Sequence, residues 1–298
     1  MDFCSFKKLF SGYRAGLLHQ SLPDNAPAFM IIGAQKAGTT ALYSYLSQHP
    51  GIAASPAKEL HFFNCEKKYL LGIDFYHSLF PSVGKNQLTF DASPSYLCHL
   101  NASKRIFAYN RKIKIIVLLR DPVERAYSAW NMYAKLYKRN KNWFYDEWLA
   151  NCDTSKSKYV KRSELAIFDF KDYILEEFEV QQISPSAIIE APVILHGYYY
   201  DQLSRLYSYF PEKQILIIEN SELRKNSVSI LQRIEKFLGL SGNDWSKANL
   251  SPVFEGDYCG AHPDEGTFRI LSKHYAPHTE KLFNFLGVHY SWYSYRNF

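Results

Sequence analysis

The stretch that decides the fold runs from residue 29 to residue 48 and reads Phe29-Met-Ile-Ile-Gly33-Ala-Gln-Lys36-Ala-Gly38-Thr39-Thr40-Ala-Leu-Tyr-Ser-Tyr-Leu-Ser-Gln48. An apolar run leads into a loop bounded by glycines and then into a helical pattern, which predicts a strand, a turn and a helix. The spacing of Gly33, Gly38 and the two threonines fits the G-x-x-x-x-G-K-[ST] frame of phosphate-binding loops, except that Thr39 stands at the lysine position. The loop carries its lysine inside the turn instead, at Lys36.

Loops of this kind bind anions through their backbone. Glycines let successive N–H groups converge on an anion, and the N-terminal end of the following helix adds positive charge. Because the lysine is displaced, we expect a phosphate-like ligand other than an ordinary nucleoside triphosphate. The alternative is a purely structural turn with glycines at its bends. The candidate binding residues in this stretch are Gln35, Lys36, Ala37, Gly38, Thr39 and Thr40.

The remaining sequence alternates between strand-like and helical segments. Apolar, β-rich runs lie at 29–32, 88–90, 113–119 and 215–218. Helical patterns lie at 40–48, 100–109, 122–138, 163–180, 199–210 and 226–238. This alternation predicts an α/β fold, a P-loop-like single domain with a central, mostly parallel sheet flanked by helices. We expect that domain to span residues 27–298, after a helical N-terminal extension at residues 1–26.

Composition excludes several classes of protein. A chain of 298 residues, 47% of them hydrophobic, can bury one large core, which excludes wholesale disorder. No apolar run approaches the ~18 residues that span a bilayer, so we expect no transmembrane segment. The five cysteines are scattered without the spacing of a zinc site, which predicts no metal and reduced thiols in a cytoplasmic protein.

Polar side chains follow two of the predicted strands. Asp91 follows the run at 88–90, and Arg120 follows the run at 113–119. Because ligands of parallel sheets bind at the carboxyl ends of the strands, these exits are the natural site. Asp121 and Pro122 then read as the N-cap and the first residue of the next helix.

Arg120 and Ser128 form a candidate grip for one phosphate. A guanidinium at a strand exit can bind a phosphate with two hydrogen bonds, and a hydroxyl two turns into the adjoining helix can add a neutral donor. A structural salt bridge is the alternative for Arg120. We expect Arg125, on the same helix, to form a surface ion pair.

The hexapeptide at 58–63 pairs a carboxylate with an imidazole. Glu59 and His61 are two residues apart, so on an extended segment they face the same side. Such a pair suggests acid–base chemistry, since burial makes a carboxylate more basic. The alternative is an edge-strand glutamate with an incidental histidine.

Basic and aromatic residues interleave between residues 133 and 145, within a chain of net charge +6. The aromatic rings there could stack on sugars or on single-stranded nucleic acid; they are Tyr133, Tyr137, Trp143, Phe144 and Tyr145. No recognisable nucleic-acid module accompanies them, so we expect no nucleic-acid partner.

Taken together, these segments resemble the sulfotransferases that use 3′-phosphoadenosine 5′-phosphosulfate, especially the heparan-sulfate-type branch and its bacterial relatives. The loop at 33–40 is similar to that family's 5′-phosphosulfate loop, and the segment from Arg120 to Ser128 resembles its 3′-phosphate motif. The segment at 58–63 is similar to the one that carries the catalytic glutamate. The segment at 196–203, which contains Tyr199, resembles an element whose tyrosine lies near the nucleotide.

The resemblance implies a role for each candidate residue. Lys36 and the amides of residues 37–40 would neutralise the leaving phosphate without a metal, while Arg120 and Ser128 would hold the 3′-phosphate. Glu59 would take the proton of the acceptor, and His61 would orient it or contact the transferring sulfate. The donor, 3′-phosphoadenosine 5′-phosphosulfate, would be a co-substrate.

Two departures from the heparan branch leave the acceptor open. The branch has a lysine within the strand exit, where this chain reads Asp91-Ala-Ser-Pro94, and its basic, disulfide-bridged C-terminal loop is replaced by a short segment at 255–263. The short loop fits a bacterial, cytoplasmic enzyme better than one of the Golgi lumen, which is the alternative location. We expect a glycan acceptor. A small alcohol or a carrier-bound β-hydroxyacyl chain is the alternative, and the oligomeric state stays open.

Two other functions compete with sulfuryl transfer. A P-loop kinase or NTPase predicts a lysine at position 39 and an acidic strand end for Mg²⁺, where this chain has Thr39 and Arg120. A module that only binds anionic glycans would need no ordered glutamate.

Overall fold

The computed structural model describes residues 22–84, 86–148, 159–184, 187–251 and 265–292. Its centre is a five-stranded sheet in the order β2-β3-β1-β4-β7, with every neighbouring pair parallel. The strands are β1 (Pro27–Gly33), β2 (Ile52–Ala54), β3 (Leu88–Ala92), β4 (Lys114–Leu119) and β7 (Ile215–Glu219). All four strands expected from the sequence are confirmed. β2 was not expected, because a three-residue edge strand is too short to show a pattern.

The helices connect successive strands, as a parallel sheet requires. The longer ones are α2 (Thr39–Leu46), α5 (Ala102–Tyr109), α6 (Pro122–Arg139), α8 (Phe170–Ile183), α9 (Tyr199–Tyr207), α11 (Ser227–Leu238) and α12 (Glu265–Leu286). Shorter α-helices, of one to two turns, are α3 (Glu66–Tyr69), α4 (Ile73–Ser78), α7 (Glu164–Ile167) and α10 (Asn220–Lys225). Tighter 3₁₀ turns are η1 (Pro94–Tyr96), η4 (Leu195–Gly197), η5 (Glu212–Gln214) and η6 (Trp245–Lys247), and η2 (Phe144–Trp148) is a π-helical turn. A second small sheet pairs β5 (Tyr159–Val160) with β6 (Ile188–Ile189).

Two helical expectations need correction. The predicted helix at 163–180 is two helices, because the side chain of Asp169 accepts a hydrogen bond from the amide of Asp172 and starts α8 anew. In addition, α12, the longest helix among the described residues, was not predicted from the sequence, because Pro277 lies inside it.

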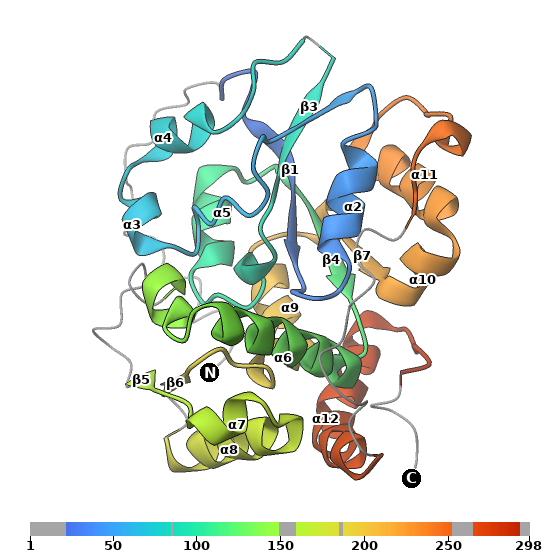
Figure 1. The fold of residues 1–298 in the computed structure, drawn as a ribbon. Coiled ribbons are helices and arrows are strands. Elements are labelled where there is room, and N and C mark those ends of the chain that lie inside the picture. The colour runs from blue at the N-terminus through green and yellow to red at the C-terminus, as the bar shows by residue number, and fades with distance from the viewer. Residues whose placement is uncertain (1–21, 85, 149–158, 185–186, 252–264, 293–298) are drawn as a thin grey trace, which may run out of the picture.

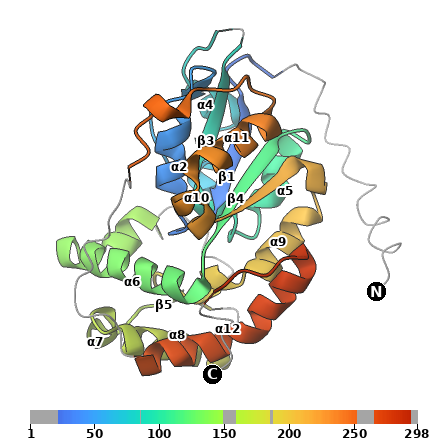
Figure 2. The same ribbon diagram turned by 90° about the vertical axis from the view of Figure 1, so that its right-hand side faces the viewer.

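The helices form two layers around the main sheet and a third below it. Figure 2 shows the sheet between α2, α10 and α11 on one face and α5 and α9 on the other. In Figure 1, α6 crosses under the carboxyl ends of the strands, and α7, α8 and α12 lie beyond it. The predicted single α/β domain is confirmed. Among the described residues, no helix has the length and apolar character needed to span a bilayer.

The buried hydrophobic residues fall into two clusters. The larger one surrounds the sheet, and the smaller one fills the space between α6, α8 and α12. Four of the aromatic residues that interleave with the basic run belong to the smaller cluster and are at most 5% exposed: Tyr133, Tyr137, Trp143 and Phe144. Of these five rings only Tyr145 is exposed, so the other four cannot stack on a ligand from solvent. The four buried rings lie on the side of α6, and of the segment that follows it, that faces the smaller cluster.

Candidate active site

The glycine-bounded loop adopts a tight turn at the end of β1. Gly38 has a φ of 96°, in the left-handed region that disfavours a side chain, and a Cβ there would lie 2.8 Å from the Nδ2 of Asn220. Gly33 is needed for another reason, because a Cβ at this position would lie 2.5 Å from the Cβ of Leu97. Both glycines of the frame are therefore explained by close approach of the backbone to neighbouring segments.

Protein donors occupy the carbonyl groups of this loop. The guanidinium of Arg120 donates to the carbonyl of Lys36 at 3.3 Å, and the amide of Asn220 donates to the carbonyl of Ala37 at 2.9 Å. The first intrahelical bond of α2 runs from the amide of Leu42 to the carbonyl of Gly38. The amides of Thr39 and the two residues after it therefore have no intrahelical acceptor, as in any first helical turn, and can face an anion.

Lys36 is held among other cations. Its backbone has a φ of 67°, and its Nζ lies 3.9 Å from the Sδ of Met132 on α6. Burial lowers the pKa of Lys36, and the positive charge of Arg120 lowers it further, while Glu59 acts in the opposite direction. The lysine expected to act on the bound anion is thus within electrostatic reach of the two other charged residues predicted for the site.

Arg120 connects β4 to the loop and to α6. Besides the Lys36 carbonyl, its guanidinium contacts the Oε2 of Glu124 at 3.2 Å through both Nε and Nη2. The salt bridge that the sequence left as an alternative is therefore present. Ser128 follows Glu124 by four residues on α6 and lies on the same helix face, partly exposed.

The segment with Glu59 and His61 is a loop and not the extended strand expected. Both residues have positive φ values, 65° and 55°, so the alternation argument that put them on one side does not apply. Their side chains nevertheless meet, with 3.4 Å between the Oε2 of Glu59 and the Nε2 of His61. The proximity comes from two left-handed residues, a conformation that costs about 1–2 kcal/mol each and that concentrates at functional sites.

A hydrogen bond from His61 and the positive charge of Lys58 lower the pKa of the Glu59 carboxylate. Burial alone would raise it, but the hydrogen bond from His61 and the charge of Lys58, whose Nζ lies 2.5 Å from Oε1, bring the pKa to about 2, so the expectation that burial makes this carboxylate more basic is wrong. The Nδ1 of His61 lies 3.2 Å from the hydroxyl of Ser95 and 3.3 Å from the Oδ1 of Asn64. The side chain of Glu59 as a whole is 41% exposed, so a substrate can reach this residue.

Asp91, the other carboxylate at a strand exit, is inaccessible. It is fully buried and accepts hydrogen bonds from the hydroxyls of Tyr76, Tyr96 and Ser93. Burial raises the pKa of Asp91, although these three hydrogen bonds oppose the rise. A group in this environment cannot meet an acceptor from solvent.

Three further predicted positions have different outcomes. Asp121 caps α6 through the amide of Val123, as expected. Arg125 is fully buried and donates to the carbonyl of Val193, so the expected surface ion pair is wrong. Tyr199 is 2% exposed, and its hydroxyl donates to the carbonyl of Arg120 at 2.9 Å, which places it behind the strand exit.

The sequence analysis missed one side chain that shapes the site. Asn220 directly follows β7, and the rule that ligands bind at strand exits could have identified it. Gln35 accepts a hydrogen bond from the buried hydroxyl of Tyr133 at 2.9 Å, so this predicted binding residue tethers the loop to α6.

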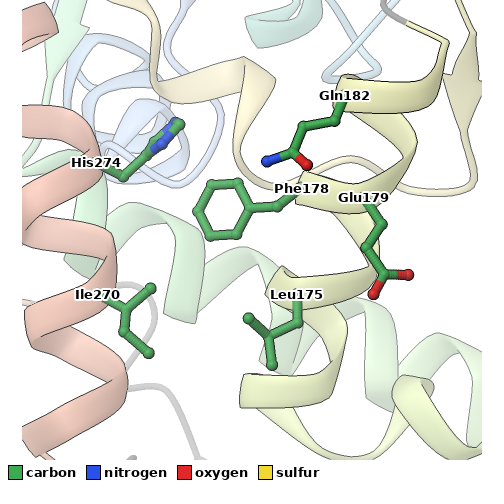
Figure 3. Close-up of a pocket in the computed structure, with 6 residues that line it drawn as sticks. All are labelled: Leu175, Phe178, Glu179, Gln182, Ile270 and His274. Carbon is green, nitrogen blue, oxygen red and sulfur yellow. The ribbon is translucent and has the colours of Figure 1, made fainter.

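The remaining observations concern metal ligands, cysteines, segments that the structure does not describe and a groove away from the predicted site. Within the described ranges, no cluster of three potential metal ligands occurs, and Cys98 is a free thiol. Residues 1–21 of the helical extension expected at 1–26 and the segment at 255–263 lie outside the described residues, and residues 22–26 are not helical. A groove of about 430 Å³ opens between α8 and α12, lined by Leu175, Phe178, Glu179, Gln182, Ile270 and His274 (Figure 3), and none of the predicted site residues lines it.

Several known proteins are similar to this chain in sequence or in fold. The profile of a protein family described as "Sulfotransferase domain" matches residues 26–251. The human "Bifunctional heparan sulfate N-deacetylase/N-sulfotransferase 3" is 30% identical over 280 residues, which cover 90% of this chain but only 29% of that protein. The mouse "Heparan sulfate glucosamine 3-O-sulfotransferase 5" is 26% identical over 94% of this chain and 82% of its own length. A solved sulfotransferase from Alicyclobacillus acidocaldarius is similar in fold, with a TM-score of 0.64, 25% identity and coverage of 89% of this chain and 98% of that one.

Proposed function

Because this chain belongs to the sulfotransferase domain family, we propose that it transfers a sulfuryl group from 3′-phosphoadenosine 5′-phosphosulfate to an acceptor hydroxyl or amine. The observation that carries this proposal is the convergence of one carboxylate and several cations at the carboxyl ends of the sheet. Glu59 and Arg120 both act on the pKa of Lys36, although the three residues are far apart in the sequence.

The donor side of the site is the loop between β1 and α2. The amides of Thr39 and Thr40 and the charge of Lys36 would bind the 5′-phosphosulfate. Arg120 and Ser128 would bind the 3′-phosphate, and the Arg120 guanidinium would exchange Glu124 for that phosphate. The depressed pKa of Lys36 makes its proton easier to share with the leaving oxygen. This cationic set suits a donor whose negative charge grows on the leaving phosphate.

The acceptor side is the turn that carries Glu59 and His61. The acceptor oxygen or nitrogen bonds to sulfur, the bond from sulfur to the bridging phosphate oxygen breaks, and adenosine 3′,5′-bisphosphate leaves. Glu59 takes the proton of the acceptor, and His61 orients the carboxylate through the contact at 3.4 Å. Both ends must be aligned for an in-line displacement, which is why positioning dominates such reactions.

We propose a glycan as the acceptor. The relatives with the N- and 3-O-sulfotransferase names are described as acting on heparan sulfate, and Lys58 beside the base offers positive charge to an anionic sugar. A screen of glycans, small alcohols and carrier-bound hydroxyacyl chains with ³⁵S-labelled donor tests this. Transfer to glycans alone is expected, and transfer to small alcohols alone would contradict the acceptor class.

The donor is tested separately by binding. Adenosine 3′,5′-bisphosphate should raise the melting temperature, while ATP with Mg²⁺ should have little effect. Replacing Arg120 or Ser128 by alanine should weaken binding of the bisphosphate far more than binding of adenosine 5′-phosphosulfate, which lacks the 3′-phosphate. Equal losses for both ligands would mean that the two residues only support the fold.

The base is tested by Glu59→Gln. This change keeps the size of the side chain, so nucleotide affinity should remain, while turnover should fall by about 10²–10⁴. Full activity of this variant would exclude Glu59 as the base.

A further inference from the structure

A buried hydrogen-bond network connects Asp91 to the turn that carries Glu59. The hydroxyl of Ser93 donates to Oδ1 of Asp91 at 2.7 Å, and the hydroxyl of Tyr96 donates to Oδ2 at 2.7 Å. Each hydroxyl also accepts one bond from the turn: Ser93 from the amide of His61 at 3.2 Å, and Tyr96 from the amide of Phe62 at 2.9 Å. Because the hydroxyl groups of Ser93 and Tyr96 both donate to the Asp91 carboxylate, the lone pairs of the two hydroxyl oxygens are left to accept hydrogen bonds from the turn.

The same segment is also fixed to the donor loop. The amide of Leu97, next to Tyr96, donates to the carbonyl of Ile32 at 2.8 Å. Leu97 packs so closely on Gly33 that only a glycine fits there. The amide of Glu59 donates to the carbonyl of Ala92 at 3.2 Å, which ties the turn to the end of β3. The residues from Asp91 to Leu97 therefore lie between the two halves of the site and contact both.

We propose that Asp91, Ser93 and Tyr96 are positioning residues that hold the Glu59–His61 turn at a fixed place relative to the donor loop. This inference rests on the proposed function, since it assigns the network a role in sulfuryl transfer. The turn needs such support because its two left-handed residues are strained and would relax without it. A base displaced by 1 Å can lose about 10² in rate, so the network has a kinetic effect apart from its effect on stability.

The chain offers a matched control in Tyr76. Its hydroxyl donates to the same Oδ2 of Asp91 at 3.0 Å, and it is fully buried like Tyr96. The structure gives this hydroxyl no hydrogen bond to the turn among the described residues. The ring of Tyr76 stacks on Phe62 at 4.5 Å, and phenylalanine would keep that contact. Tyr76→Phe and Tyr96→Phe thus remove the same group from the same carboxylate, and only the second removes an acceptor for the turn.

The experiment compares these two variants by amide hydrogen exchange and by kinetics. In Tyr96→Phe, the amide of Phe62 should exchange about five- to tenfold faster, as the loss of one hydrogen bond predicts, and kcat should fall by about 10–10². Tyr76→Phe should lose stability but keep slow exchange at Phe62 and a kcat near that of the wild type. Binding of adenosine 3′,5′-bisphosphate should be the same in all three proteins.

Equal exchange at Phe62 and equal kcat in the two variants would overturn the proposal. If Tyr96→Phe does not fold, Ser93→Ala gives the same test through the amide of His61, whose exchange should accelerate. The exchange measurement needs no turnover. A wild-type chain that binds the bisphosphate but transfers no sulfuryl group would refute the proposed function, and exchange would still decide whether Tyr96 holds the turn.

Discussion

At the scale of single residues, the site is a set of charges that change one another's proton affinity. Burial and the charge of Arg120 lower the pKa of Lys36, and His61 and Lys58 lower the pKa of Glu59. Removing one charge should therefore alter the chemistry of its neighbours without unfolding the chain.

Replacing Lys36 by alanine should lower turnover by about 10²–10³, because an electrostatic group at the leaving phosphate is lost. The Cβ remains, so the cost of the left-handed backbone at this position is unchanged and the fold should survive. Steady-state kinetics with thermal melting checks this, with Lys236→Ala on the exposed face of α11 as the control. Activity within about twofold of the wild type would argue against a role for Lys36.

Replacing Lys58 by alanine should move the acid limb of kcat/KM to higher pH. Lys58 lowers the pKa of Glu59 by its charge and by its hydrogen bond, so its removal raises that pKa from about 2. Glu59 must be ionised to accept a proton, and it would then be protonated and inactive at a higher pH than in the wild type. The pH profiles of kcat/KM for Lys58→Ala and for Lys67→Ala, an exposed lysine of α3, are the measurement. An acid limb that does not move in Lys58→Ala would contradict the assignment of Glu59.

At the scale of elements, the parts of the site that could be predicted are those with a repeating or spaced pattern. Continuous apolar runs identified four strands, and the spacing of Gly33 and Gly38 identified the loop. No pattern encodes the two left-handed residues at Glu59 and His61, so their turn was read as extended. The burial of Arg125 was equally hidden, because its partner, the Val193 carbonyl, is distant in the sequence.

The turn before α2 should tolerate no side chain at its second glycine. Gly38→Ala forces an alanine into the left-handed backbone conformation, which costs about 1–2 kcal/mol. Its Cβ also clashes with the side chain of Asn220, which donates a hydrogen bond to the loop carbonyl of Ala37. Stability and affinity for adenosine 3′,5′-bisphosphate should both fall. Gly239, which ends α11 with a φ of 79° and has nothing within 4 Å of a built Cβ, is the matched control.

Calorimetric titration separates the two effects of this change. Gly239→Ala should lose similar stability through its backbone and keep nucleotide affinity. If both variants bind the bisphosphate equally well, the loop is not the nucleotide site.

At the scale of the whole molecule, three partly buried histidines are neutral in the folded chain and become charged when it unfolds. Burial lowers the pKa of His99 and His274 to about 4 and that of His196 to about 3, from an ordinary value of 6.5. Positive neighbours add to the effect, namely Arg105 beside His99, Arg125 beside His196 and His278 beside His274. These three side chains come from α12 and from segments next to α5 and α9, so they report on most of the fold.

The free energy of unfolding should therefore fall as the pH drops from 7 to 5. In this range the unfolded chain binds protons at these histidines and the folded chain does not. The free energy of unfolding therefore rises with pH, and the loss of stability caused by these histidines disappears only above about pH 6.5. Urea denaturation across the range should show proton uptake on unfolding, of which these three histidines account for up to about three protons. His274→Gln should reduce that uptake by about one proton, since glutamine does not titrate. A pH dependence that is the same in the variant and in the wild type would mean that His274 is already accessible to protons in the folded protein.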